Sequence, residues 1–381
     1  MNEFKKKIVD GLKNNKPQLL TKNLIADIET PISSLLKIKK NQNYSFLLES
    51  VEGGSQRGRY SLLGCDPDLI WQVDNNLASV KYNYENYNYK ISNKPIESLK
   101  NIIEFSKFDK GNIDVPFPIL VGYLGYPMIQ YMEKILLKNN DNINIPDSIL
   151  IRPKIVAVFD NIKDKITVMT VVYPNEKKNY ETDFNEAQEL LELKVNQLKE
   201  NLVQEPDSQI KSNLKFISNY SKEEYFSIIA KAKKYIEDGD IFQVVTSQRF
   251  QTKYELEAIS LYRSLRRLNP SPYLVNLNFN EIGLVASSPE LLVQLRNQKI
   301  TIVPTFTVPL PLRNNKEQDT ITSNSADKPT KQEIMNQALE FHLQGNTIEA
   351  ARYYRYFIDQ GFKDCRVLSN YGSILQDLGK L

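Results

Sequence analysis

The sequence predicts an α+β fold with a mostly antiparallel sheet, followed by a C-terminal helical hairpin. Apolar or alternating runs typical of strands are numerous, and few helical patterns separate them. A doubly wound parallel sheet would need a helix between successive strands, so we expect antiparallel pairing. Residues 313–330 contain two apolar side chains, Ile321 and Ala326, which predicts a flexible linker. Helical periodicity resumes after this linker.

Composition excludes several function classes. The net charge of +3 comes from interspersed charges of both signs, with no basic face that would predict nucleic-acid binding. The two cysteines, Cys65 and Cys365, lie far apart, so we expect no disulfide framework and a reducing, cytoplasmic compartment. A single histidine, His342, leaves too few ligands for a Cys/His zinc site. No secretory signal or membrane-spanning run of about 20 apolar residues is present.

The first 205 residues carry most of the expected strands. Apolar and aromatic content, or alternation of apolar and polar residues, marks each of them. A charged N-terminal segment and two amphipathic segments predict helices. We expect strands at 44–51, 59–64, 69–73, 79–84, 121–125, 154–159 and 165–172, and helices at 4–12, 128–136 and 191–202.

The segment 218–304 is the most strongly patterned part of the chain. Ser221 and Glu224 have the spacing of a capping box at a helix start, and Gly239 is placed to end that helix. A second helix is expected to end before Asn269-Pro270. We expect strands at 241–250, 273–279, 282–286 and 291–295, and the second helix at 257–268.

Four stretches, in this order, resemble one known family. They are LLESVEGGSQRGRYSLLG, VGYLGYPMIQYMEK, RPKIVAVFDN, and a central stretch containing GDIFQVVTSQRF, NPSPYL and ASSPELLV. Together they resemble anthranilate synthase component I of the chorismate-utilising enzymes, over roughly residues 10–304. The resemblance implies an α+β sandwich. It also implies an N-terminal region at 1–205 and the start of a chorismate-binding core at 206–312, before the linker and the helices of 331–381.

The family's reaction belongs to tryptophan biosynthesis. Its members convert chorismate and ammonia into anthranilate and pyruvate as carbon–oxygen lyases, with Mg²⁺ as cofactor. A glutaminase subunit usually supplies the ammonia. The resemblance therefore implies chorismate as substrate, Mg²⁺ as cofactor and a glutaminase subunit as partner.

The resemblance also implies a feedback site for free tryptophan. Glu49 and Ser50 would form one wall, and Pro272, Tyr273 and Leu274 the other. A carboxylate can pair with the ammonium of the ligand, and a hydroxyl can bond its polar end. From the residues alone, Glu49 equally fits the wet face of a half-buried strand. The NPSPY run equally fits a rigid turn between a helix and a strand.

The chain departs from the family after residue 304. Thr307-Val308 stands where the family has a Gly-Thr pair that contacts chorismate. The later Mg²⁺ carboxylates and the family's histidine have no match, and His342 lies in a different kind of segment. We expect a truncated protein with no catalytic residues, no metal site and no activity. Alternatives are a non-catalytic tryptophan- or protein-binding module, an aminodeoxychorismate synthase large-subunit-like protein, or a sequence artefact.

The C-terminal segment shows an internal period. Gly372 follows Ala338, and Gly379 follows Gly345, at the period of the tetratricopeptide repeat, which is about 34 residues. Small residues at these positions would let helices approach closely. The segment therefore resembles a tetratricopeptide repeat cut short, with a peptide as its expected partner. An ordinary helical hairpin is the alternative.

Overall fold

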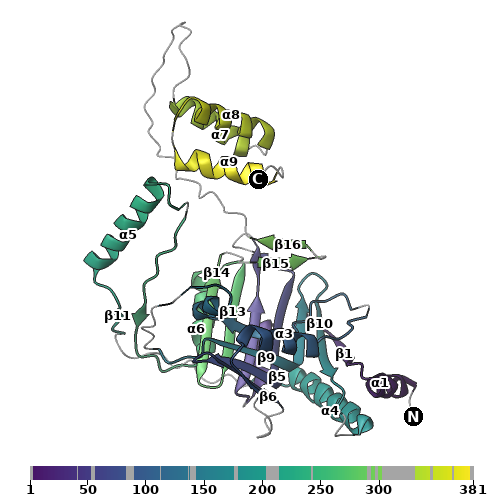
Figure 1. Cartoon of the computed structure of the whole chain (residues 1–381). Coiled ribbons are helices and arrows are strands. Elements are labelled where there is room, and N and C mark those ends of the chain that lie inside the picture. The colour runs from purple at the N-terminus through teal and green to yellow at the C-terminus, as the bar shows by residue number, and fades with distance from the viewer. Residues whose placement is uncertain are drawn as a thin grey trace. The chain divides into compact units, whose positions relative to one another are not determined.

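The chain folds into two compact units, each with its own elements (Figure 1). The sheet unit comprises Met1–Ile210 and Glu255–Glu290, and the helical unit comprises Lys211–Tyr254 and Leu291–Leu381. The expected boundary at residue 205 and the expected linker stay predictions, because residues 203–213 and 303–330 lie outside the described part. The computed structural model describes residues 3–40, 42–52, 56–82, 90–111, 113–135, 137, 143–175, 179–202, 214–241, 243–289, 293–296, 299–302, 331–343, 346–362 and 364–377.

A large antiparallel sheet forms the sheet unit, which confirms the predicted fold class. Among the described residues it has ten strands, and its main path runs β1-β10-β9-β5-β2-β13-β14. β6 pairs with β5 and β7, and β8 pairs with β9. The strands are β1 (Gln18–Ile25), β2 (Tyr44–Glu49), β5 (Tyr60–Asp74), β6 (Leu77–Tyr82), β7 (Lys90–Ser92), β8 (Val121–Leu124), β9 (Ser148–Asp160), β10 (Lys165–Val172), β13 (Tyr273–Phe279) and β14 (Ile282–Ser288).

Two predicted strands prove to be one. The runs 59–64 and 69–73 belong to the single long strand β5, which pairs with β9 along its length. The register shifts between Pro67 and Leu69, and Asp66 before it has a φ of 52°. Proline argues against a continuous strand, so the sequence predicts an interruption there. A bulge tolerates proline and a positive φ without ending the strand. The expected helix at 128–136 is a short 3₁₀ helix, η1 (Tyr126–Tyr131).

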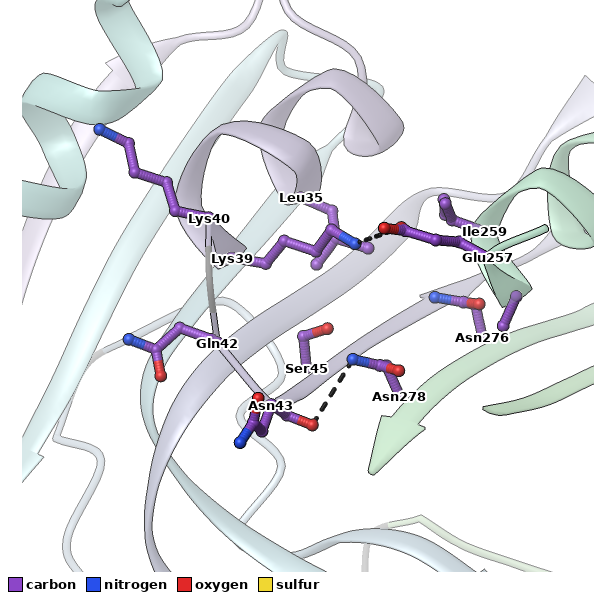
Figure 2. A pocket seen from close by; sticks show the side chains of 11 residues that line it. Leu35, Lys39, Lys40, Gln42, Asn43, Ser45, Glu257, Ile259, Asn276 and Asn278 are labelled. Atoms are coloured by element: carbon purple, nitrogen blue, oxygen red, sulfur yellow. Dashed lines mark hydrogen bonds and ion pairs between the residues drawn. The ribbon is translucent and has the colours of Figure 1, made fainter. Parts of the chain in front are cut away.

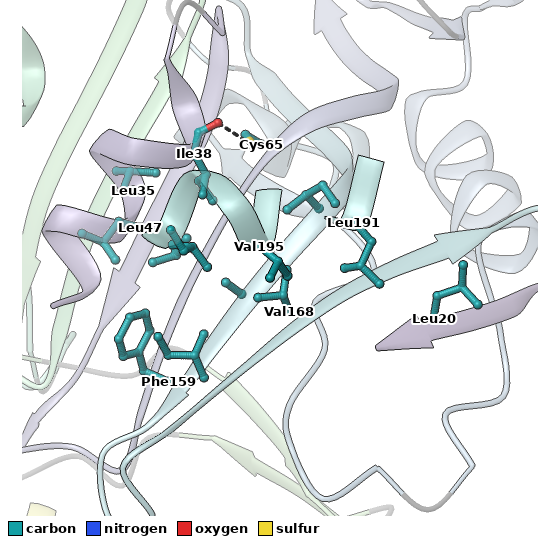
Figure 3. Close-up of a cluster of buried hydrophobic side chains, with 14 of the residues drawn as sticks. Leu20, Leu35, Ile38, Leu47, Cys65, Phe159, Val168, Leu191 and Val195 are labelled. Atoms are coloured by element: carbon teal, nitrogen blue, oxygen red, sulfur yellow. Dashed lines mark hydrogen bonds between the residues drawn. The ribbon is translucent and has the colours of Figure 1, made fainter. Parts of the chain in front are cut away.

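Helices cover one face of this sheet. α1 (Glu3–Lys13), α2 (Pro31–Lys39), α4 (Tyr180–Lys199) and α6 (Ala258–Leu268) contribute to one apolar cluster with strand residues (Figure 3). Burying a leucine, valine or phenylalanine side chain contributes about 1.5–3 kcal/mol, so this cluster is the main source of stability for the unit. A fifth helix, α3 (Pro95–Phe105), packs near β6 in a separate cluster around Trp71. The members shown in Figure 3 include Leu20, Leu35, Ile38, Leu47, Phe159, Val168, Leu191 and Val195.

The first helix of the helical unit is α5 (Lys222–Glu237), and its start confirms the predicted capping box. Glu224 N donates to Ser221 Oγ at 3.2 Å, and Ser221 N donates to Glu224 Oε2 at 2.8 Å. Gly239 has a φ of 82°, which explains why a glycine ends the helix. α5 has no buried residue among those described, and its Phe226 is exposed.

The expected strand at 241–250 is wrong over most of its length. The structure has β12 (Phe250–Gln251), which pairs with β11 (Ile217–Ser218), and no strand over the described residues 243–249. A strand needs a neighbour for its backbone groups, and local β propensity cannot supply one. β15 (Val293–Arg296) and β16 (Lys299–Ile302) form a separate hairpin.

Three described C-terminal helices extend the expected hairpin. They are α7 (Lys331–Leu343), α8 (Thr347–Asp359) and α9 (Cys365–Asp377). Tyr354 lies fully buried in their apolar core and accepts a hydrogen bond from Asn370 Nδ2 at 3.0 Å. Ala338 is also fully buried, which agrees with the expectation of a small side chain at a helix contact. Gly372 differs from expectation, because a Cβ added there would meet no atom within 4 Å. Close helix approach therefore does not explain this glycine. Gly345 and Gly379 lie outside the described residues.

Candidate functional site

The structure brings together the two walls expected for a ligand site. β2 and β13 are neighbours in the sheet, and Leu274 lies directly opposite Glu49 in their antiparallel register. Opposed residues point to the same face of a sheet, so Glu49 and Leu274 both face the layer of helices. Segments that are far apart in the sequence thus become adjacent at the positions that the sequence singled out.

Glu49 is buried and held by α6. Tyr262 donates its hydroxyl to Glu49 Oε2 at 2.6 Å. Arg266 Nε lies 2.9 Å from Oε2, and Arg266 Nη2 donates to Oε1 at 3.1 Å. A bidentate arginine and a phenol hydroxyl stabilise the carboxylate in a place where an unpaired charge would be costly. The alternative of a strand carboxylate facing water does not describe Glu49.

Tyr262 is fully buried beside this carboxylate. Burial raises the pKa of its hydroxyl far above 10.0, and the charge and hydrogen bond of Glu49 raise it further. Both causes disfavour the phenolate. Tyr262 therefore remains a neutral hydrogen-bond donor to Glu49 across the ordinary pH range.

Ser50 follows directly on β2 and lies against Gly58. Gly58 N donates to Ser50 O at 2.7 Å, and a Cβ added at Gly58 would come within 2.6 Å of Ser50 Oγ. A side chain at residue 58 would therefore collide with Ser50. Glycine at this position lets the two segments meet. The rest of the glycine turn, residues 53–55, lies outside the described residues.

The turn before β13 is fixed by serines. Ser287 Oγ donates to Asn269 O at 2.7 Å and lies 2.9 Å from Ser271 Oγ. Pro272 is exposed, Tyr273 is half-buried and Leu274 is buried. The predicted rigid turn and the predicted wall are thus the same segment, and its side chains differ in their access to solvent.

Sequence reasoning missed Tyr262 and Arg266. Both lie on α6, at three and seven residues after the buried Ile259, which places all three on one helical face. An arginine on the apolar face of an amphipathic helix indicates a buried acid opposite it. That signal was present in the sequence, but it does not identify Glu49 as the acid.

Groups that could hold a metal are absent from the described residues. No cluster of three or more His, Cys, Asp or Glu side chains with suitable geometry occurs among them. The donor set that Mg²⁺ prefers is therefore not met in that part of the chain.

None of the described helices is long and apolar enough to cross a bilayer. Thr307 and Val308 lie outside the described residues.

Comparisons with known proteins agree with the fold. The model of the chorismate binding enzyme family matches residues 44–305. Anthranilate synthase component 1 of Cereibacter sphaeroides is 36% identical over 305 residues, which cover 77% of this chain and 60% of that protein. The Acetivibrio thermocellus protein of the same name is 30% identical over 368 residues, covering 93% of this chain and 69% of that protein.

A solved structure shows the same likeness. Anthranilate synthase component I from Streptococcus pneumoniae TIGR4 superposes with a TM-score of 0.54 at 25% identity, covering 74% of this chain and 60% of that one. The match to the Aquifex aeolicus protein covers 57% of that relative. The chain thus spans about three fifths of the length of several relatives that it matches.

Proposed function

Because the chain belongs to the chorismate binding enzyme family, we propose that it serves tryptophan biosynthesis as an anthranilate synthase component I-like protein whose described part carries a feedback site for free tryptophan. The proposal includes a cytoplasmic location and a glutaminase subunit as partner of the complete activity. Both follow from the likeness to anthranilate synthase component 1 proteins.

The observation that supports the tryptophan site is the register between β2 and β13. Glu49 pairs with Leu274, so Ser50 and Tyr273 also come from adjacent strand ends. A carboxylate, a hydroxyl and an apolar wall are the groups that a zwitterion with a large aromatic side chain requires. The rigid NPSPY turn keeps the apolar wall in place before the ligand binds, which lowers the entropic cost of binding.

The Glu49 carboxylate has one hydrogen-bonding position left beside its partners Tyr262 and Arg266. A carboxylate offers about four lone-pair positions, and Tyr262 and Arg266 together make three contacts with Glu49. We propose that the ammonium of tryptophan takes the remaining position. Tyr262 and Arg266 then act as positioning residues that hold the carboxylate in one orientation.

Isothermal titration calorimetry with tryptophan tests this site. We expect weak binding by the full chain, preference for tryptophan over phenylalanine, and loss of binding in Ser50→Phe, because the ring fills space that Ser50 shares with Gly58. Ser50→Ala is the matched control, since it removes the hydroxyl without adding volume. Equal binding by the wild type and by folded Ser50→Phe would exclude the site. No binding at all would favour the other readings, an aminodeoxychorismate synthase-like or protein-binding role.

We also propose that this chain alone does not form anthranilate. Thr307-Val308 replaces the family's Gly-Thr pair, and the described residues offer no set of carboxylates for Mg²⁺. The reaction expels a hydroxyl, which needs a Lewis acid or a proton donor near the leaving oxygen. The chain should therefore form no fluorescent product from chorismate, ammonia and Mg²⁺. Turnover above about 1 s⁻¹ would contradict this proposal.

A second proposed function concerns the three C-terminal helices. α7 begins at Lys331 and α9 begins at Cys365, and α8 lies between them. The distance between these two starts matches the period of a tetratricopeptide repeat, about 34 residues. The three helices would then be one repeat and the first helix of the next, which supports a peptide-binding role for this segment. A deletion of residues 331–381 should abolish peptide capture and leave tryptophan binding unchanged.

A further inference from the structure

A polar cavity lies at the other end of the same two strands. Its volume is about 330 Å³, and it opens between the end of α2, the start of β2, β13 and the start of α6 (Figure 2). This volume is at the lower end of the range for small-molecule sites, and it suits a ligand on the order of ten non-hydrogen atoms. The side chains that line it are those of Leu35, Lys39, Lys40, Gln42, Asn43, Ser45, Glu257, Ala258, Ile259, Asn276 and Asn278.

Two buried polar atoms in this lining have no hydrogen-bond partner in the part of the chain that the structure describes. Ser45 has no exposed surface, Asn276 is 2% exposed, and both line the cavity. Ser45 Oγ and Asn276 Oδ1 find no hydrogen-bond partner among the described residues. Leaving a buried polar atom unpaired destabilises a folded chain, and such atoms in native proteins generally have a partner that the protein itself does not supply.

The start of α6 adds an electrostatic preference. Glu257 is its N-cap residue, and this helix start has no side-chain cap. The free N–H groups and the helix dipole attract an acceptor or a negative charge. The lining carries two lysines and one glutamate, a net charge of +1. A ligand therefore meets the backbone N–H groups at the start of α6, beside the paired charges of Lys39 and Glu257, and neutral amides with a hydroxyl on the strands.

We propose that this cavity binds a small polar carboxylate that carries a hydroxyl or ammonium group beside its acid group. The carboxylate lies toward the start of α6 and Lys39. An ammonium donates to both Asn276 Oδ1 and Ser45 Oγ, whereas a hydroxyl donates to Asn276 Oδ1 and accepts from the Ser45 hydroxyl; either arrangement satisfies both unpaired atoms. This site is separate from the tryptophan site and does not depend on the proposed function.

The charges that are already paired exclude other ligands. Lys39 Nζ lies 3.0 Å from Glu257 Oε2, and Lys40 Nζ lies 3.1 Å from Glu200 Oε2. A phosphate or dianion would need both lysines free. A purely apolar molecule would leave Ser45 and Asn276 unpaired. A small hydroxy or amino carboxylate meets all of these conditions.

The test is saturation-transfer NMR on the full chain with glycerate, L-serine and L-glutamine as probes. Propionate, which has a carboxylate and no donor, is the matched control ligand. We expect binding of at least one probe, no signal with propionate, and a loss of at least tenfold in affinity in Asn276→Leu. Because this change also removes a buried unpaired atom at similar volume, the free variant should melt about 2–4 °C above the wild type.

Two further variants keep the test decisive. Ser45→Ala removes the second unpaired atom with little change in volume and should weaken the same probe if Asn276→Leu does not fold. Asn101→Leu makes the same replacement at an exposed position of α3 and should leave binding unchanged. Failure of every probe to bind, or equal binding by the wild type and both cavity variants, would overturn the site. Binding of tryptophan alone with sensitivity to Asn276→Leu would also overturn it, because the cavity would then belong to the tryptophan site.

Discussion

The paired strands β2 and β13 present two opposite solutions to burying polar groups on one face. At one end, Glu49 is charged and buried, and α6 supplies it with Tyr262 and Arg266. At the other end, Ser45 and Asn276 are neutral and buried, and no described residue forms a hydrogen bond with Ser45 Oγ or Asn276 Oδ1. The described part of the chain thus provides partners for the charged group, whose unpaired burial would cost the most free energy. It provides none for the two neutral atoms, whose burial costs less. The open end contains the cavity.

The largest effect should come from breaking the paired end. Arg266→Ala leaves the Glu49 charge buried with Tyr262 as its partner, and we expect a loss of roughly 3 kcal/mol in the free energy of unfolding. Denaturant unfolding measures this loss. Arg267→Ala, at an exposed position of the same helix, is the matched control and should change stability by less than about 0.5 kcal/mol.

A double variant sharpens this result. Glu49→Leu combined with Arg266→Leu removes both charges and should be more stable than Arg266→Ala, because no charge remains buried alone. A double variant less stable than Arg266→Ala would show that packing, and not the ion pair, dominates this end.

Tyr262→Phe should have an intermediate effect. It removes the hydroxyl that donates to Glu49, and a hydrogen bond to a charged group contributes about 1.5–3 kcal/mol. The pKa of Tyr262 is raised in the folded chain, so its neutral form is favoured there. Its contribution is therefore complete below pH of about 10 and declines as pH rises above that value. Tyr262→Phe should flatten this part of the alkaline decline. An unchanged alkaline slope would show that Glu49 does not depend on this hydroxyl.

The smallest effect is expected at the rim of the open end. Lys39→Met removes the ion pair with Glu257, whose side chain is 71% exposed. Such pairs contribute about 0–1 kcal/mol because water and salt screen them. The methionine side chain still covers the cavity wall as the lysine stem does. If Lys39→Met destabilised the chain as much as Arg266→Ala, the contrast between the two ends would be lost.

Local sequence patterns predicted several elements well. β10 has the predicted limits, β13 has the predicted limits, and α6 begins one residue after its expected start. The capping box of α5 formed as its residues indicate. These features depend on periodicity and on contacts within three or four residues, so the sequence contains all the information that they need.

Features that depend on distant partners escaped the sequence. Residues 243–249 have strand-forming side chains and no strand, because no strand of the described part pairs with this run. β5 continues through a register shift at Pro67 because β9 pairs with it on both sides. The partner thus decided whether a β-prone run became a strand and where it ended.

The sequence by itself determined the α+β class and most element positions, and by resemblance it predicted that Glu49, Ser50, Pro272, Tyr273 and Leu274 share one site. The tertiary structure alone decided that Leu274 lies opposite Glu49, that Arg266 neutralises Glu49, and that Ser45 and Asn276 share a cavity. The reason is physical. A helix or strand is specified mostly by its own residues, whereas the partner of a buried charge depends on strand register and helix packing between segments that are far apart in the chain.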